Sequence, residues 1–225
     1  MRQHCIIYAD DILILAPSVE GLQKLFTLCE GELKALGLSL NTRKTVCMRI
    51  GQRYNASCCN IVTCNGMKLD WVQEMRYLGV YIVSAANFKC LFDNAKKSLY
   101  RSFNAVYGRL CNSTSEEVIL NLVRTKCLPC LLYGVDVCPV NATDRRSLEF
   151  CVKRILIKNF RTTCNDIIDE CRHFFGFSTI AKLVTKRKVK FLQSFSVICN
   201  SLCNLFKAEA EKEIQELCCS VEMAS

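Results

Sequence analysis

Two adjacent acidic residues, Asp10 and Asp11, stand near the start of the sequence between the apolar runs 5–8 and 12–16. The runs read as two short buried strands, and the acidic pair falls where the chain reverses between them. Two ionised carboxylates at such a site repel each other and are costly to remove from water. A hard divalent cation bound by carboxylate oxygens is therefore the favoured partner. The alternative is a plain Asp-Asp β-turn at the surface.

Three motifs, in this order, carry a resemblance to a known family. Tyr8-Ala9-Asp10-Asp11 resembles the Tyr/Phe-x-Asp-Asp box of reverse transcriptases, the third palm motif of that polymerase fold. The segment from Gly37 to Thr45 is similar to the Gly-Leu-x-x-Asn-x-x-Lys-Thr/Ser pattern of non-LTR retrotransposon and group II intron enzymes. Met75 to Ile82 resembles the Tyr-Leu-Gly box where palm meets thumb. The sequence thus resembles the C-terminal part of a non-LTR (LINE-type) retrotransposon reverse transcriptase.

The resemblance implies an RNA-directed DNA polymerase that works by two-metal nucleotidyl transfer. Asp10 and Asp11 would bind Mg²⁺ (or Mn²⁺) in the full-length parent, and Tyr8 and Ala9 would lie beneath the primer terminus. Lys44 would assist the leaving pyrophosphate as an electrostatic helper or proton donor. A solvated lysine after a turn is the alternative reading of Lys44. The implied partners are an RNA template, a DNA primer duplex and dNTP.

Further residues are expected to contact nucleic acid. In the family the Tyr-Leu-Gly box grips the primer, and basic helix faces suit a phosphate backbone. An ordinary strand with a bulge at glycine and an ordinary solvated helix face are the respective alternatives. The residues predicted to contact nucleic acid are Arg76, Tyr77, Leu78, Gly79, Lys96, Lys97, Lys186, Arg187 and Lys188.

The family's first palm motif supplies another essential Asp and precedes the Asp-Asp box, yet only nine residues stand before Asp10. We therefore expect this polypeptide to be inactive alone. Such a truncation would also leave apolar strand edges uncovered, which predicts poor solubility. Two other readings stay open: a non-catalytic, basic helical nucleic-acid-binding remnant, and a helical protein-interaction module.

The sequence pattern predicts an α+β fold, whose strands and helices must position these residues. A helix capped by Ser18 and ended by Gly37 should pack on a sheet shared by the Asp-Asp hairpin and the Tyr-Leu-Gly strand. Helices should follow from about Phe88, one of them opened by capping boxes within 113–117. Later helices are expected over 143–160, 165–175, 178–190 and 191–218. We expect a partial palm over 1–87, a thumb-like helical region over 88–160 and a C-terminal helical extension over 161–225.

The composition bears on partners and compartment. A formal charge of +9 favours polyanionic partners. The N-terminus lacks signal-peptide features, and no apolar stretch is long enough to span a membrane. The 18 cysteines are therefore expected to be reduced thiols of an intracellular protein, nuclear or cytoplasmic and not secreted. No stable protein partner can be deduced.

Overall fold

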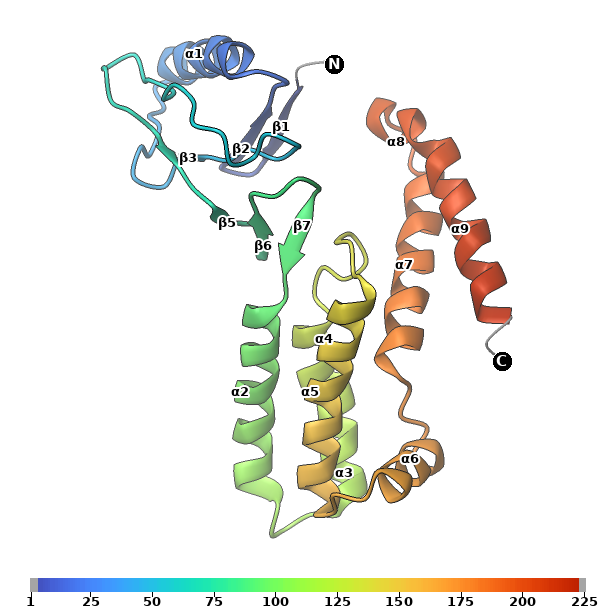
Figure 1. Cartoon of the computed structure of the whole chain (residues 1–225). Helices are drawn as coiled ribbons and strands as arrows, with labels where there is room; N and C mark the ends of the chain where they lie inside the picture. Colours follow the sequence, from blue (N-terminus) through green and yellow to red (C-terminus); the bar gives the residue numbers. More distant parts are fainter. Residues whose placement is uncertain (1–3, 223–225) are drawn as a thin grey trace. The chain divides into compact units, whose positions relative to one another are not determined.

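Short strands and one helix make up the first part of the chain, and helices make up the rest (Figure 1). The computed structural model describes residues 4–222. The predicted α+β fold is confirmed. The chain divides into two units, one ending at Cys90 and the other beginning at Leu91. The domain limits expected from sequence, at residues 87 and 160, stay predictions.

The strands of the first unit form three small sheets. Antiparallel strands β1 (His4–Tyr8) and β2 (Asp11–Leu15) form one, parallel strands β3 (Val46–Cys47) and β4 (Asp70–Trp71) the second, and β5 (Glu74–Tyr77), β6 (Val80–Val83) and β7 (Lys89–Leu91) the third. The expectation that the Asp-Asp hairpin shares a sheet with the Tyr-Leu-Gly strand is therefore wrong. Among the described residues, no strand adds to either outer edge of the β1–β2 pair, so nothing links it to the third sheet.

Helix α1 (Val19–Ala35) follows the hairpin and confirms the predicted helix at both ends. The Ser18 hydroxyl accepts a hydrogen bond from the Gly21 backbone N–H at 3.1 Å, as an N-cap does. Gly37 has φ +72°, the left-handed conformation that stops a helix. The ends of α1 are thus set by local sequence.

The core of the first unit joins α1 to the chain that follows it. Phe26 of α1 is buried with Cys47, Ile61 and Leu69, and Ile14 of β2 packs against this cluster. The hairpin is held to the core through that contact.

A reciprocal pair of hydrogen bonds reinforces this core. The Gln23 side-chain amide donates to the Val62 carbonyl and accepts from the Val62 N–H, both at 2.8 Å. The side chain therefore pairs with a backbone unit as a neighbouring strand would.

The second unit is helical. Its helices are α2 (Asp93–Leu110), α3 (Glu116–Leu122), α4 (Leu128–Leu131), α5 (Ala142–Phe160), α6 (Asn165–Phe174), α7 (Ile180–Val197), α8 (Ser201–Leu205) and α9 (Lys207–Glu222). The helix expected from Phe88 begins only at Asp93, because residues 89–91 pair as strand β7. The boundary expected at residue 190 is also wrong, since α7 continues to Val197 and the break falls at 198–200.

The helix caps of the second unit match the sequence only in part. Asn141 and Asp144 form a capping box at the start of α5, with the Asn141 side chain accepting from the Asp144 N–H at 2.8 Å. The capping boxes expected within 113–117 do not form. The Thr114 hydroxyl instead donates to the Leu110 carbonyl at 3.0 Å, at the end of the preceding helix.

A wide π-helical turn, η1 (Val123–Cys127), lies between α3 and α4. Pro129 follows it at the start of α4. Proline lacks a backbone N–H and collides with the carbonyl four residues earlier in a regular α-helix, so a local widening is expected here.

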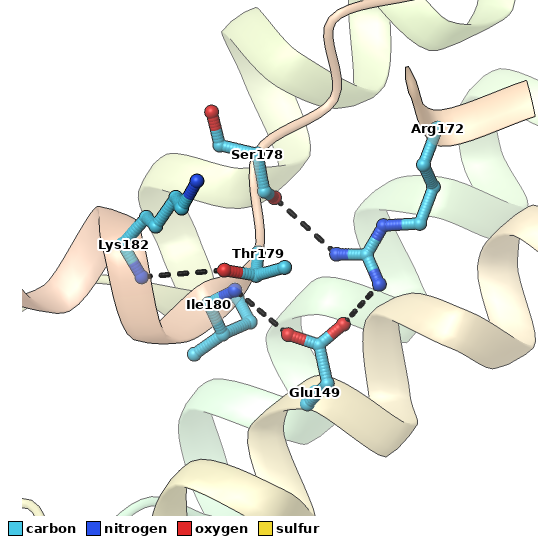
Figure 2. A network of polar contacts seen from close by, with 6 residues as sticks. All are labelled: Glu149, Arg172, Ser178, Thr179, Ile180 and Lys182. Atoms are coloured by element: carbon cyan, nitrogen blue, oxygen red, sulfur yellow. Dashed lines mark hydrogen bonds and ion pairs between the residues drawn. The ribbon is translucent and has the colours of Figure 1, made fainter. Parts of the chain in front are cut away.

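Arg172 and Glu149 tie three helices together (Figure 2). The Arg172 side chain, from α6, forms an ion pair with Glu149 of α5 and donates to the Ser178 carbonyl at 3.3 Å. The other Glu149 oxygen accepts the Ile180 N–H at 2.7 Å, at the start of α7. One carboxylate thus fixes α6 and α7 against α5.

Candidate active site and nucleic-acid surface

The Asp-Asp pair lies at the tip of the β1–β2 hairpin, as predicted. Tyr8 and Asp11 face each other as the last pair of the ladder, and Ala9 and Asp10 form the two-residue turn. Asp10 therefore belongs to the turn and Asp11 to the first position of β2. The two side chains start from different backbone conformations although they are adjacent in sequence.

The strands that carry the pair are not buried, which corrects the sequence interpretation. Every residue of β1 is exposed, including Ile7 at 69% and Tyr8 at 63%. Asp10 and Asp11 are exposed as well. The apolar pattern did predict strands correctly, but with two strands in the sheet only the β2 side reaches the core, through Ile14.

The turn departs from the usual residue preference at Ala9, whose φ is +52°. A side chain in this conformation costs about 1–2 kcal/mol relative to the right-handed region, and two-residue hairpin turns normally place Gly, Asn or Asp there. Strain of this kind clusters at functional sites. Ala9, in this conformation, and Asp10 together form the tip of the hairpin.

Lys44 lies in a tight turn whose geometry is set by Asn41. The Asn41 carbonyl accepts from the Lys44 N–H and the Thr45 N–H, both at 3.0 Å, and the Asn41 side chain accepts from the Arg43 N–H at 3.2 Å. The Lys44 side chain is exposed. Within residues 4–222 it makes no ion pair with Asp10 or Asp11, so the structure does not join these predicted catalytic residues.

The Tyr77-Leu78-Gly79 segment forms a hairpin turn. Tyr77 pairs with Val80, and Leu78 and Gly79 between them have φ angles of +46° and +82°. Neither a continuous strand nor a bulge at Gly79 is correct. Arg76 precedes the turn on β5 and is exposed. The side chains of Arg76 and Leu78 are therefore accessible at this end of the hairpin.

The donor set at the Asp-Asp turn fits part of a magnesium site. Across residues 4–222 no three His, Cys, Asp or Glu side chains come together as a group that could hold a metal ion. Two carboxylates nevertheless match what Mg²⁺ takes from a protein, because it is usually bound through one or two carboxylates and completes its shell with waters and substrate phosphates. Asp10 and Asp11 would be those ligands.

The predicted phosphate-binding cations of α7 are not equivalent. Lys186 is exposed, whereas Lys188 forms an ion pair with Glu213 of α9. Arg187 donates from Nη1 to the Leu132 carbonyl at 3.2 Å. Two of the three predicted cations are therefore already engaged within the protein.

The two predicted cations of α2 differ in the same way. Lys97 is exposed, and Lys96 is bonded to Asp93 at 3.1 Å. Lys97 is the more available of the two for an external anion.

Comparison with known protein families places the Asp-Asp turn, the Lys44 turn and the Tyr-Leu-Gly turn inside one matched segment. Residues 1–82 match the family "Reverse transcriptase (RNA-dependent DNA polymerase)". The matched segment therefore covers the first unit as far as strand β6. Enzymes of this family act on nucleic acids. No curated protein and no solved structure gave a match.

A helix that crosses a membrane must be long and predominantly apolar. No helix between residues 4 and 222 combines the length and apolar character that crossing a membrane requires.

Sequence reasoning identified the helix over 143–160 as basic but did not single out the exposed aromatic residue among its cations. Arg146, Phe150, Arg154 and Lys158 follow one another at intervals of four residues, and Phe150 is 60% exposed. Successive residues four apart are neighbours on a helix surface, so this spacing was a usable signal. The packing of α5 against α2 depends on tertiary contacts, which the spacing of residues along one helix does not reveal.

Proposed function

We propose that residues 1–82 form part of the palm of a non-LTR retrotransposon reverse transcriptase, which copies an RNA template into DNA. The placement of Asp10 and Asp11 at a hairpin turn inside the matched segment carries this proposal. The pattern from Gly37 to Lys44 favours the non-LTR type. The second unit would be the region that follows the palm and holds the template and primer.

In this proposal Asp10 and Asp11 bind Mg²⁺ through their carboxylate oxygens. The metal, when bound, activates the primer hydroxyl and neutralises phosphate charge. Tyr8 and Ala9 support the primer terminus beside the carboxylates. Lys44 supplies positive charge toward the pyrophosphate of the incoming dNTP.

We further propose that this polypeptide does not synthesise DNA by itself. A two-metal site needs a carboxylate besides Asp10 and Asp11. Among residues 4–222 no third acidic, histidine or cysteine side chain groups with them. Arg76 and the Tyr77-Leu78-Gly79 turn would contact the primer strand without completing the metal site.

Metal binding and primer extension test the proposal separately. Mn²⁺ titration followed by electron paramagnetic resonance should show a site that is lost in Asp10→Asn/Asp11→Asn and kept in Asp70→Asn, a control at an exposed acid of the same segment. Primer extension on an oligo(dT)-primed poly(rA) template should show no synthesis. Mn²⁺ binding that survives the double substitution would contradict the metal assignment, and robust synthesis abolished by Asp10→Ala would contradict the proposed inactivity.

The second candidate function is a non-catalytic nucleic-acid-binding module, favoured by the exposed cations Lys97 and Lys186. It predicts binding that falls steeply with salt and survives loss of Asp10 and Asp11. Binding that requires both carboxylates and Mg²⁺ would contradict this second candidate.

A further inference from the structure

The packing of α2 against α5 leaves an open groove between the two helices. Tyr107 of α2 donates from its hydroxyl to the Lys158 carbonyl of α5 at 3.0 Å, which fixes the helices side by side. The groove has a volume of about 530 Å³. Its lining residues are Tyr100, Phe103, Asn104, Arg154, Ile155, Ile157 and Lys158.

Two cations of α5 border this groove and are held by aromatic rings. The Lys158 ammonium lies 4.9 Å from the Tyr107 ring centroid and 5.6 Å from that of Phe103, and it donates to the Asn104 side chain at 3.2 Å. The Arg154 guanidinium lies 5.9 Å from the Phe150 ring centroid. Within the described residues neither cation forms an ion pair with a carboxylate. Both charges are thus oriented and remain available to an anion.

The acidic residues of the two helices do not neutralise the groove. Asp93 is bonded to Lys96, and Asp144 is used in the cap of α5. Glu149 is engaged by Arg172 and the Ile180 N–H. Because no acid lines the groove, its charge is positive and it complements a polyanion.

The aromatic residues indicate which polyanion fits. Phe150 is 60% exposed beside Arg154, and an exposed ring next to a guanidinium gives a base a surface on which to stack. Tyr100 adds a phenol to the groove lining, and burial raises the pKa of this phenol to about 12. Paired bases in a duplex are already stacked on their neighbours, so only an unpaired strand can offer base faces.

We propose that the α2–α5 groove binds single-stranded nucleic acid through phosphate contacts of Arg154 and Lys158, with a base stacked on Phe150, which lies next to the groove against Arg154. This site lies outside the segment 1–82 and requires neither Asp10 nor Asp11. The inference rests on the proposed role of the second unit in holding nucleic acid and names the kind of strand that the groove binds, whereas metal binding at Asp10 and Asp11 tests the polymerase function separately.

The full chain should be titrated with a fluorescein-labelled oligo(dT) of twelve nucleotides. Phe150→Ala should weaken binding by about fivefold or more, from the loss of one stacking contact. The matched control is Phe174→Ala on α6, because Phe174 is 82% exposed but packs edge-on against Phe175, whereas Phe150 lies against Arg154 of the groove lining. That control should leave the affinity unchanged.

The cations should show their role through salt dependence. Arg154→Gln and Lys158→Gln should each weaken oligo(dT) binding and lower the slope of log affinity against log salt by about 0.7, the value expected for one phosphate contact on a single strand. The circular dichroism spectrum of each variant should match that of the parent protein, which shows that the variant is folded. Arg154→Lys should restore the slope but not the full affinity, because lysine does not stack as a guanidinium does.

Three outcomes would overturn the proposal. The first is an equal effect of Phe150→Ala and Phe174→Ala on oligo(dT) binding. The second is a loss of affinity for a twelve-base-pair duplex in Phe150→Ala that equals the loss for oligo(dT). The third is polyglutamate that competes as well as oligo(dT), which would indicate an acidic protein as the partner.

Discussion

Glu149 and Arg172 form an ion pair between α5 and α6 although 23 residues separate them in the sequence. Arg172 is only 9% exposed, and its Nε has no hydrogen-bond partner among the described groups. The guanidinium therefore relies on Glu149 for charge compensation. Glu149, by contrast, also has the Ile180 N–H as a partner.

This asymmetry predicts unequal effects of removing either partner. Glu149→Ala leaves a buried guanidinium unpaired and should lower the free energy of unfolding by about 3 kcal/mol. Arg172→Met should cost less, because the Glu149 carboxylate keeps a donor. Far-UV circular dichroism in urea reports mainly on the helical second unit, while fluorescence of Trp71 reports on the first. An equal loss of stability in the circular dichroism and Trp71 fluorescence transitions would contradict this prediction. So would a greater loss of stability for Arg172→Met than for Glu149→Ala.

The exposed β1 strand predicts a solubility effect. Its Ile7 is 69% exposed on a two-stranded sheet, and unpaired strand edges with apolar side chains promote association. Ile7→Lys should raise the soluble concentration measured by light scattering. Leu28→Lys is the control, since Leu28 is 66% exposed on helix α1 and lies on no strand edge. Equal gains from both substitutions would show that strand pairing is not the cause.

Two buried thiols predict a loss of stability at alkaline pH. Burial raises the pKa of Cys47 and of Cys127 from 9.0 to about 11. Between these values the unfolded chain ionises while the folded chain keeps its protons, so this contribution is complete below pH 9 and is lost as the pH rises to about 11. Urea unfolding at pH 8 and pH 10 should show a lower free energy of unfolding at the higher pH.

Substitution of one thiol separates this effect from general alkaline unfolding. Cys47→Ala should reduce the pH dependence of the Trp71 transition, whereas Cys59→Ala, at an exposed cysteine of the same unit, should not. An unchanged pH dependence in Cys47→Ala would refute the assignment.

The basic residues of α7 predict different phenotypes for neighbouring lysines. Lys186→Gln removes an exposed charge and should lower the salt slope of duplex binding by about 0.9, the value for one phosphate contact on B-DNA. Lys188→Gln breaks the ion pair with Glu213 and should cost at most about 1 kcal/mol of stability, with a smaller change in binding. Equal salt slopes for the two variants would contradict this difference.

Elements governed by local signals could be predicted from sequence. Ser18 and Gly37 mark the ends of α1, and the helix expected over 143–160 matches α5, whose capping box at Asn141 and Asp144 was not singled out. The Asp10–Asp11 turn was also found, because apolar strands flank an acidic pair. Each of these features depends on residues within a few positions of one another.

Features set by distant contacts could not be predicted. The burial of β1 was overestimated, because an apolar run indicates a strand without indicating what covers it. The pairing of Lys188 with Glu213, which lies 25 positions further along the chain on α9, could not be predicted from local sequence. The sequence around Lys89 gave no sign of strand β7, which depends on β6 as its neighbour.

The wide turn before Pro129 has a consequence for how its helices face the core. Ile119, Val123, Cys127 and Leu131 recur every four residues, and each is at most 3% exposed. In a regular α-helix each such step overshoots a full rotation by about 40°, so the row would spiral off the buried side. Residues 123–127 take a looser winding that cancels part of this overshoot. Deleting one residue there would restore tighter winding and rotate Leu131 out of alignment with Ile119.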